Sequence, residues 1–260
     1  MRKIMTGLAI FILAVSVNCA TQSTNYCKNR DYIATMKQKA EADFNRQDYY
    51  AALDDITQVK KCSPKDSEAY YWLGRIYLAR QERAKALEDL NQSIAYNPAY
   101  AEARMALGMM LLEDGKYDEA IAQFKIPANN DSFREAYVAW NNMGYIYLQQ
   151  GKLTESDDAL RRSLALNKSF CLAYANLGEL RSKQKQYLEA SNNLLKAIET
   201  CPNLGHAHRL LGLEYNRQGK ISEACAEFNL AFKNSTADSE DAKSSANYLK
   251  LLNCSVSPGK

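Results

Sequence analysis

The chain has 260 residues, of which 47% are hydrophobic and 24% charged, a composition typical of a soluble globular protein and not of a disordered chain. Its 33 basic and 30 acidic residues give a formal net charge of +3, so it lacks the excess of positive charge with which nucleic-acid-binding proteins neutralise phosphates. Only five prolines and eleven glycines occur, which excludes a turn-rich β-sandwich and predicts an all-α protein.

The first residues resemble a secretory signal peptide. Arg2 and Lys3 precede an apolar run at residues 8–15, and this run is too short to span a bilayer. Cys19 follows, as in the signals of bacterial lipoproteins, where such a cysteine becomes the lipidated first residue of the mature chain.

The three residues before Cys19 depart from the usual lipoprotein pattern, so plain cleavage near Ala20 remains the alternative. We assign residues 1–18 to a signal peptide and 19–31 to a tether that is lipidated at Cys19. An anchor of this kind predicts that the protein faces the periplasm from the outer membrane.

One period dominates the rest of the chain. A dipeptide of one apolar residue and glycine recurs within apolar patterns of helical spacing. Its five copies are Leu73-Gly74, Leu107-Gly108, Met143-Gly144, Leu177-Gly178 and Leu211-Gly212. Three of the four steps between them are 34 residues long, and the step from Leu107 to Met143 is longer by two.

The copy at residues 67–100 resembles the tetratricopeptide repeat (TPR), whose pattern is W-x2-L-G-x2-Y, then A-x3-F, then P. The matching residues are Tyr70, Leu73, Gly74, Tyr77, Ala86, Leu90 and Pro98. Glycine in the first helix and alanine in the second let two antiparallel helices approach closely. Glycines at 115, 151 and 219 mark turns between helices, and a degenerate first copy has Ala40 in place of the glycine.

We therefore expect an all-α TPR superhelical solenoid over residues 32–253. It comprises about six helix-turn-helix repeats, at residues 33–66, 67–100, 101–136, 137–170, 171–204 and 205–238. A capping helix at 239–253, with Ala246, Leu249 and Leu252 on its apolar side, and a tail at 254–260 follow.

The residues offer no convergent catalytic chemistry, so we expect neither an enzyme nor a cofactor or metal. The only histidines, His206 and His208, are two apart on a predicted helix and point to different faces, so they cannot share a metal ion. The paired acids Asp54-Asp55 and Asp157-Asp158 are expected to face solvent. No phosphate-binding glycine loop and no CxxC motif occurs.

The first helices of successive TPRs line a concave surface, where helical-repeat proteins usually bind their partners. We expect a partner-binding surface of aromatic and methionine side chains, which suits the apolar residues of a peptide. Its members are Tyr71, Arg75, Met105, Met109, Asn141 and Tyr145. The alternative is that these residues pack between repeats. A clamp of several basic residues is disfavoured, because Arg75 has no second cation on the neighbouring helix.

Six cysteines besides Cys19 would lie in an oxidising compartment, and six cysteines allow fifteen pairings. A first helix begins near the end of its antiparallel second helix, and the cap runs antiparallel to the last second helix. This geometry predicts three sequential bridges, Cys27–Cys62, Cys171–Cys201 and Cys225–Cys254.

The third repeat is irregular. Pro127 is expected to stop or kink its second helix, and a polar loop should lead into the next repeat at about Phe133. This stretch, FKIPANNDSFREAYVAWNNMG, and the start of the last helix, ADSEDAKSSANYL, resemble the type IV pilus biogenesis lipoproteins of the PilF/PilW/Tgl pilotin family.

That resemblance implies a non-enzymatic outer-membrane adaptor that helps the pilus secretin to insert and multimerise. Three alternatives stay open: an adaptor for peptidoglycan enzymes, an accessory to outer-membrane protein assembly, and a secreted TPR interaction protein without a membrane anchor.

Overall fold

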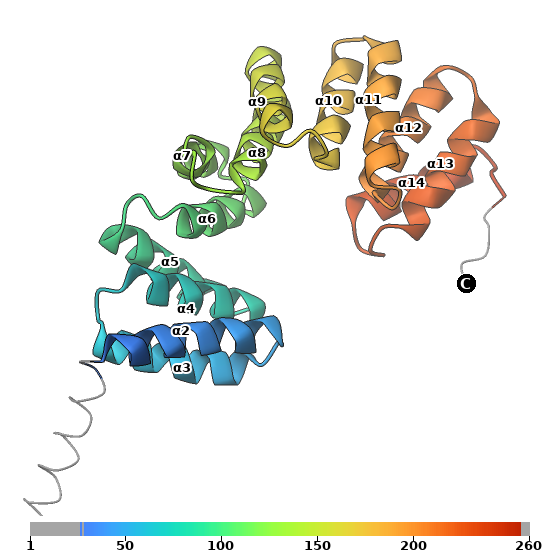
Figure 1. Cartoon of the computed structure of the whole chain (residues 1–260). Coiled ribbons are helices and arrows are strands. Elements are labelled where there is room, and N and C mark those ends of the chain that lie inside the picture. The colour runs from blue at the N-terminus through green and yellow to red at the C-terminus, as the bar shows by residue number, and fades with distance from the viewer. Residues whose placement is uncertain (1–26, 28, 256–260) are drawn as a thin grey trace, which may run out of the picture. The chain divides into compact units, whose positions relative to one another are not determined.

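The computed structural model describes residue 27 and residues 29–255, so the expected signal peptide and Cys19 lie outside the described residues. Within the described part, the chain forms α-helices joined by short turns and contains no strand, which confirms the predicted all-α class (Figure 1). Two compact units divide the chain between Met110 and Leu111, inside helix α6.

Unit 1 ends at Met110, and its described residues form two helix pairs and most of a fifth helix. The helices are α2 (Arg30–Asn45), α3 (Tyr49–Cys62), α4 (Ser67–Ala79), α5 (Arg83–Tyr96) and α6 (Ala101–Glu113). Its core is built from the motif positions of both pairs, including Ala40, Ile56, Leu73 and Leu90, all of which are buried.

Unit 2 begins at Leu111. Its helices are α7 (Tyr117–Ala128), α8 (Ala136–Gln149), α9 (Leu153–Leu166), α10 (Cys171–Lys183), α11 (Tyr187–Thr200), α12 (Gly205–Arg217), α13 (Ile221–Lys233) and α14 (Glu240–Leu251). The pairs α8–α9, α10–α11 and α12–α13 each pack tightly, and each pair also touches the next.

The recurring glycine of the repeats is explained by how closely two paired helices approach. A Cβ atom added to Gly74 would lie 2.6 Å from Cγ of Leu90, a side chain that is completely buried. Any side chain at this position would push α4 away from α5.

The turn after each first helix places one residue in the left-handed region. Gly115, Gly151 and Gly219 have φ angles of 71°, 72° and 73°, as expected for the turns predicted at these glycines. Gln81 and Lys185 take the same place after α4 and α10, both with φ 62°, so the turn conformation is retained where the sequence has no glycine.

Buried serines add a link within repeats that the sequence pattern did not reveal. The Ser93 hydroxyl donates to the Ser67 carbonyl at 2.7 Å, and the Ser163 hydroxyl donates to the Tyr137 carbonyl at 2.7 Å. Each bond joins the end of a second helix to the beginning of its first helix.

The irregular third repeat differs in detail from the prediction. Helix α7 continues through Pro127 and ends at Ala128, and α8 begins at Ala136 instead of about Phe133. The missing N–H of Pro127 removes one hydrogen bond to the carbonyl four residues earlier, and the helix ends one residue after the proline. Between the helices, the Phe133 N–H donates to the Asn130 carbonyl at 2.9 Å and forms a turn.

Helix α14 packs against α12 and α13 and covers the last repeat. The Ser239 side chain caps its first turn, and Leu249 is buried while Ala246 and Leu252 are partly buried. The rings of Phe228 and Tyr248 stack with their centroids 4.8 Å apart.

Candidate functional site

Arg75 occupies an aromatic seat in unit 1. Its guanidinium carbon lies 4.8 Å from the ring centroid of Phe44 and 5.7 Å from those of Tyr71 and Trp72. One guanidinium N–H donates to the Tyr71 hydroxyl at 2.8 Å. Helix α2 supplies Phe44 and helix α4 supplies the other three residues, so two neighbouring first helices build the seat.

The basic residue of the preceding repeat is paired differently. Lys37 on α2 makes ion pairs with Asp66 and Glu68, both at 2.7 Å. Burial lowers the pKa of Lys37, but the hydrogen bonds to these two carboxylates outweigh it and hold the pKa above its ordinary value. The Lys37 ammonium is therefore neutralised within unit 1.

Three members of the predicted partner-binding surface are buried. Tyr71 and Met105 are each 8% exposed and Asn141 is 4% exposed, so the expectation that they line an open surface is wrong for them. Their side chains take part in packing: Tyr71 lies edge-on to Tyr100, and the Asn141 side-chain oxygen accepts a hydrogen bond from Asn176 at 2.9 Å.

The other three members are accessible. Met109 is 41% exposed on α6, while Arg75 on α4 and Tyr145 on α8 are half-buried. The accessible candidates that the structure retains are therefore Arg75 and Met109 in unit 1 and Tyr145 in unit 2.

The first helices of unit 2 carry more charge than the predicted apolar surface implied. The Arg209 guanidinium donates to the Asp241 carboxylate at 2.6 Å, and His206 lies 3.0 Å from the same oxygen. Burial raises the pKa of Asp241, but His206 and Arg209 outweigh it and lower this pKa to about 2. The cluster joins α12 to the cap α14, and sequence spacing gave no signal for it.

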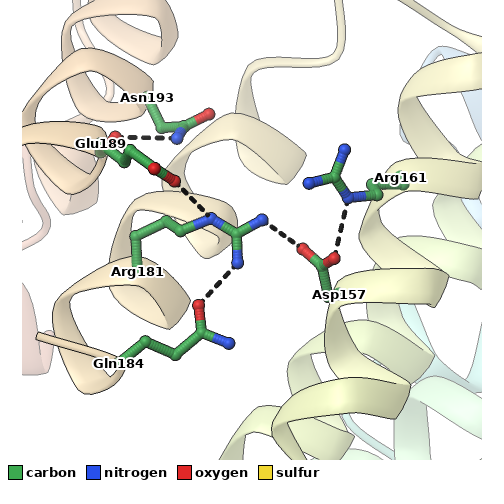
Figure 2. Close-up of polar contacts among 6 residues, drawn as sticks. All are labelled: Asp157, Arg161, Arg181, Gln184, Glu189 and Asn193. Atoms are coloured by element: carbon green, nitrogen blue, oxygen red, sulfur yellow. Dashed lines mark hydrogen bonds and ion pairs between the residues drawn. The ribbon is translucent and has the colours of Figure 1, made fainter. Parts of the chain in front are cut away.

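A second charged network ties α9, α10 and α11 together (Figure 2). The buried Arg181 side chain donates to Asp157 at 2.5 Å and to Gln184 at 2.6 Å, and it makes an ion pair with Glu189 at 3.2 Å. Asp157 also accepts from Arg161 at 2.8 Å. A cleft of about 460 Å³ adjoins this network, but the Arg181 charge is already matched by two carboxylates, so the network is structural.

The paired acids differ from the expectation that all of them face solvent. Asp55 is buried and pairs with Lys39 at 3.0 Å, and Asp157 is partly buried by the network around Arg181. Both acids face a neighbouring helix because the second helices pack against the first helices on more than one side.

The two histidines contact different partners, as their spacing predicted. His206 lies against Asp241, whereas the buried His208 lies 2.6 Å from the Glu227 carboxylate and 2.9 Å from the Pro202 carbonyl. No group of three or more potential metal ligands occurs among residues 27 and 29–255.

The cysteines that were paired by repeat geometry lie together. The Cα atoms are 4.7 Å apart in Cys27–Cys62, 5.9 Å in Cys171–Cys201 and 5.6 Å in Cys225–Cys254, and each pair has its sulfur atoms at bonding distance. One bridge lies in unit 1 and two lie in unit 2. Across the described part of the chain, none of the helices is long and apolar enough to span a membrane.

Comparison with known families accounts for the repeat. One tetratricopeptide-repeat family model matches residues 77–132, and another matches residues 137–170 and 172–204. The chain is built from tetratricopeptide repeats. TPR proteins are generally non-enzymatic scaffolds that bind protein partners, and no enzyme family is indicated for this chain.

Parts of the chain are similar in sequence to several curated proteins. The chain is 28% identical to a BBSome complex member of Bos taurus, BBS4, over 162 residues, which are 62% of this chain and 31% of that protein. It is 22% identical to the type IV pilus assembly protein PilF of Pseudomonas aeruginosa over 135 residues, 52% of this chain and 54% of PilF. The chain thus spans about a third of the BBSome relatives and about half of PilF.

Two solved structures of pilus proteins have the same fold. PilW, a type IV pilus biogenesis factor, superposes with a TM-score of 0.69 at 22% identity over 83% of this chain and 98% of PilW. PilF of Pseudomonas aeruginosa superposes with a TM-score of 0.70 at 17% identity over 81% of this chain and 95% of PilF. The chain is therefore a TPR scaffold related in fold to pilus biogenesis factors.

Proposed function

We propose that this protein is an outer-membrane lipoprotein adaptor of the type IV pilus, a pilotin that helps the secretin to assemble. The observation that carries the proposal is the superposition with PilW, which includes 98% of that protein and so matches its repeats nearly from end to end. The similarity in sequence to PilF supports the same assignment.

In this function, the N-terminal segment anchors the protein to the membrane and the repeats bind the partner. Cys19 carries the lipid anchor, and Ala20, which is uncharged, does not impose retention in the inner membrane under the usual sorting of such lipoproteins. Several acyl chains hold a protein on a membrane stably, whereas one does so only marginally. The first helices of the repeats then bind the secretin or another pilus component.

A deletion strain tests the function. It should contain secretin monomers but few heat-resistant multimers, and it should lack pili. Complementation with Cys19→Ala should move the protein out of the outer-membrane fraction. Normal multimers and normal pili in the deletion strain would contradict the pilotin assignment and favour an adaptor for peptidoglycan enzymes or for outer-membrane protein assembly.

Point variants connect the phenotype to the accessible surface. Met109→Glu places a charge on an exposed position of α6 and should reduce secretin multimers without unfolding the repeats. Leu188→Glu is the matched control, because Leu188 is 76% exposed on the second helix α11, and this variant should leave the multimers unchanged. Equal effects of the two variants would contradict a binding role for the first helices.

A further inference from the structure

Arg75 carries a charge that its surroundings do not match. A guanidinium has five N–H donors, and the contacts of Arg75 with the described residues comprise one hydrogen bond, to the Tyr71 hydroxyl, and three aromatic rings. None of the carboxylates in residues 27 and 29–255 lies within ion-pair distance of it. Lys37, one repeat earlier, pairs with two carboxylates, so the lack of an ion pair is particular to Arg75.

The rings hold this guanidinium in place before any ligand arrives. The ring centroids of Phe44 and Trp72 are 5.6 Å apart in an edge-to-face arrangement, and those of Tyr71 and Trp72 are 5.4 Å apart. The three rings that form the seat therefore pack against one another. Rings attract the guanidinium through its face and leave the donors along its edge available. Because the side chain is already ordered, a ligand loses little affinity to ordering it.

We propose that Arg75 binds the side-chain carboxylate of an aspartate or glutamate in an extended segment of a protein partner. A carboxylate accepts two parallel N–H bonds from one guanidinium and supplies the missing negative charge. The inference deepens the proposed function, since it names the chemistry of the partner, but it depends only on partner binding by the first helices and not on the pilus.

The neighbouring repeats indicate what surrounds that carboxylate. Positions 34 residues apart are equivalent in adjacent repeats, so Glu41 on α2 and Met109 on α6 flank Arg75 along the first helices of unit 1. Glu41 is exposed and makes no ion pair with Arg75, and Met109 is exposed and apolar. A partner segment therefore complements this surface when its acidic residue binds Arg75 and a neighbouring apolar residue contacts Met109.

A peptide selection tests the inference without assuming a pilus partner. The full mature chain is used to select random 12-residue peptides whose C-termini are joined to a phage coat protein, so that only side chains can supply a carboxylate. Selected peptides should share an aspartate or glutamate at one position. They are then synthesised with an amidated C-terminus, and their affinity is measured by fluorescence anisotropy.

Variants assign the binding to Arg75. Arg75→Gln should weaken the selected peptides at least tenfold, and Arg75→Lys, which keeps the charge but loses the paired donors, should weaken them less. Lys61→Gln removes the same charge from an exposed position on the second helix α3 and should leave the affinity unchanged. Circular dichroism melting of each variant identifies any loss of affinity that comes from unfolding.

Several results would overturn the inference. These are a selection that yields no binder, binders without a shared acid, or acidic peptides that bind the folded Arg75→Gln protein as tightly as the unaltered chain. Arg75-dependent binding of neutral peptides only when their C-terminus is free would also overturn it, in favour of a terminal carboxylate. None of these results bears on secretin multimers in the deletion strain, so failure here and failure of the pilotin assignment are distinguishable.

Discussion

The buried ring of His208 faces an acceptor at each nitrogen, the Glu227 carboxylate at Nδ1 and the Pro202 carbonyl at Nε2. Both contacts are satisfied only when both nitrogens carry a proton. Burial lowers the pKa of His208, but the bonds to Glu227 and Pro202 outweigh it and raise this pKa above its ordinary value.

A raised pKa in the folded state means that His208 stabilises the fold most at low pH. The contribution is complete below the pKa of the unfolded chain and disappears as the pH rises through the higher pKa of the folded chain. His208→Gln, which is neutral at every pH, should therefore lower the thermal midpoint by about 5 °C at pH 5.5 and by much less at pH 9.

Circular dichroism melts of the unaltered chain and of His208→Gln at the two pH values measure this difference. Glu227→Gln, which removes the acidic partner, should reproduce the same dependence on pH. A gap between the melting curves that is equal at pH 5.5 and pH 9 would show that folding does not raise the pKa of His208.

At the scale of the helix pair, the close approach of α4 and α5 depends on Gly74. Alanine is the better helix former by up to about 1 kcal/mol, so propensity alone favours Gly74→Ala. The added methyl group would instead lie 2.6 Å from Cγ of the buried Leu90, and overpacking of this kind costs about 1 to 3 kcal/mol. We expect a net loss of stability, measured as a lower midpoint in urea denaturation with an unchanged slope.

Gly115→Asn is the matched control for this prediction. Gly115 lies in the left-handed region, with φ 71°, and a Cβ atom there meets nothing within 4 Å. Asparagine tolerates the left-handed region, and residues other than glycine already occupy the equivalent turns after α4 and α10. If Gly115→Asn destabilised the fold as much as Gly74→Ala, steric contact between the helices would not be the reason for the glycine.

The helix pairs could be predicted from the sequence because small residues at this fixed spacing indicate closely packed antiparallel helices in TPRs. The turn glycines follow from that spacing, and the cap α14 follows from the apolar side of its helix. The sequence did not predict that Leu90 lies closer to Gly74 than Ala86 does. The side-chain direction within a helix is less determined. Met105 and Met109 are one turn apart and chemically identical, yet Met105 is buried and Met109 is exposed.

Polar pairs between side chains on different helices could not be predicted from the sequence, for a different reason. Arg181 meets Asp157 and Glu189 only because three helices converge, and no spacing along one helix reveals that contact. The same holds for the aromatic rings around Arg75. The sequence showed that Arg75 has no second cation nearby, but it did not show the contact with Phe44, which comes from another helix. Sites formed by several repeats therefore need the structure.

At the scale of the whole molecule, the three cysteine pairs restrain both units, with sequence separations of 35, 30 and 29 residues. Closing loops of this length removes freedom from the unfolded chain, which stabilises the folded one by about 3 to 4 kcal/mol for each bridge on the chain-entropy model. Since the pairs join sequential elements, they reinforce individual repeats and the cap.

We predict that the mature protein isolated without reductant contains these three bridges and no others. Peptide mapping under non-reducing conditions should recover the peptides of each pair linked to one another. Cys171→Ser combined with Cys201→Ser should lower the thermal midpoint by about 10 °C, because unit 2 loses one of its two bridges. Reductant should lower the midpoint of the unaltered chain further than that of this variant. Free thiols at all six positions, or a linked pair that joins unit 1 to unit 2, would contradict the assignment that repeat geometry makes.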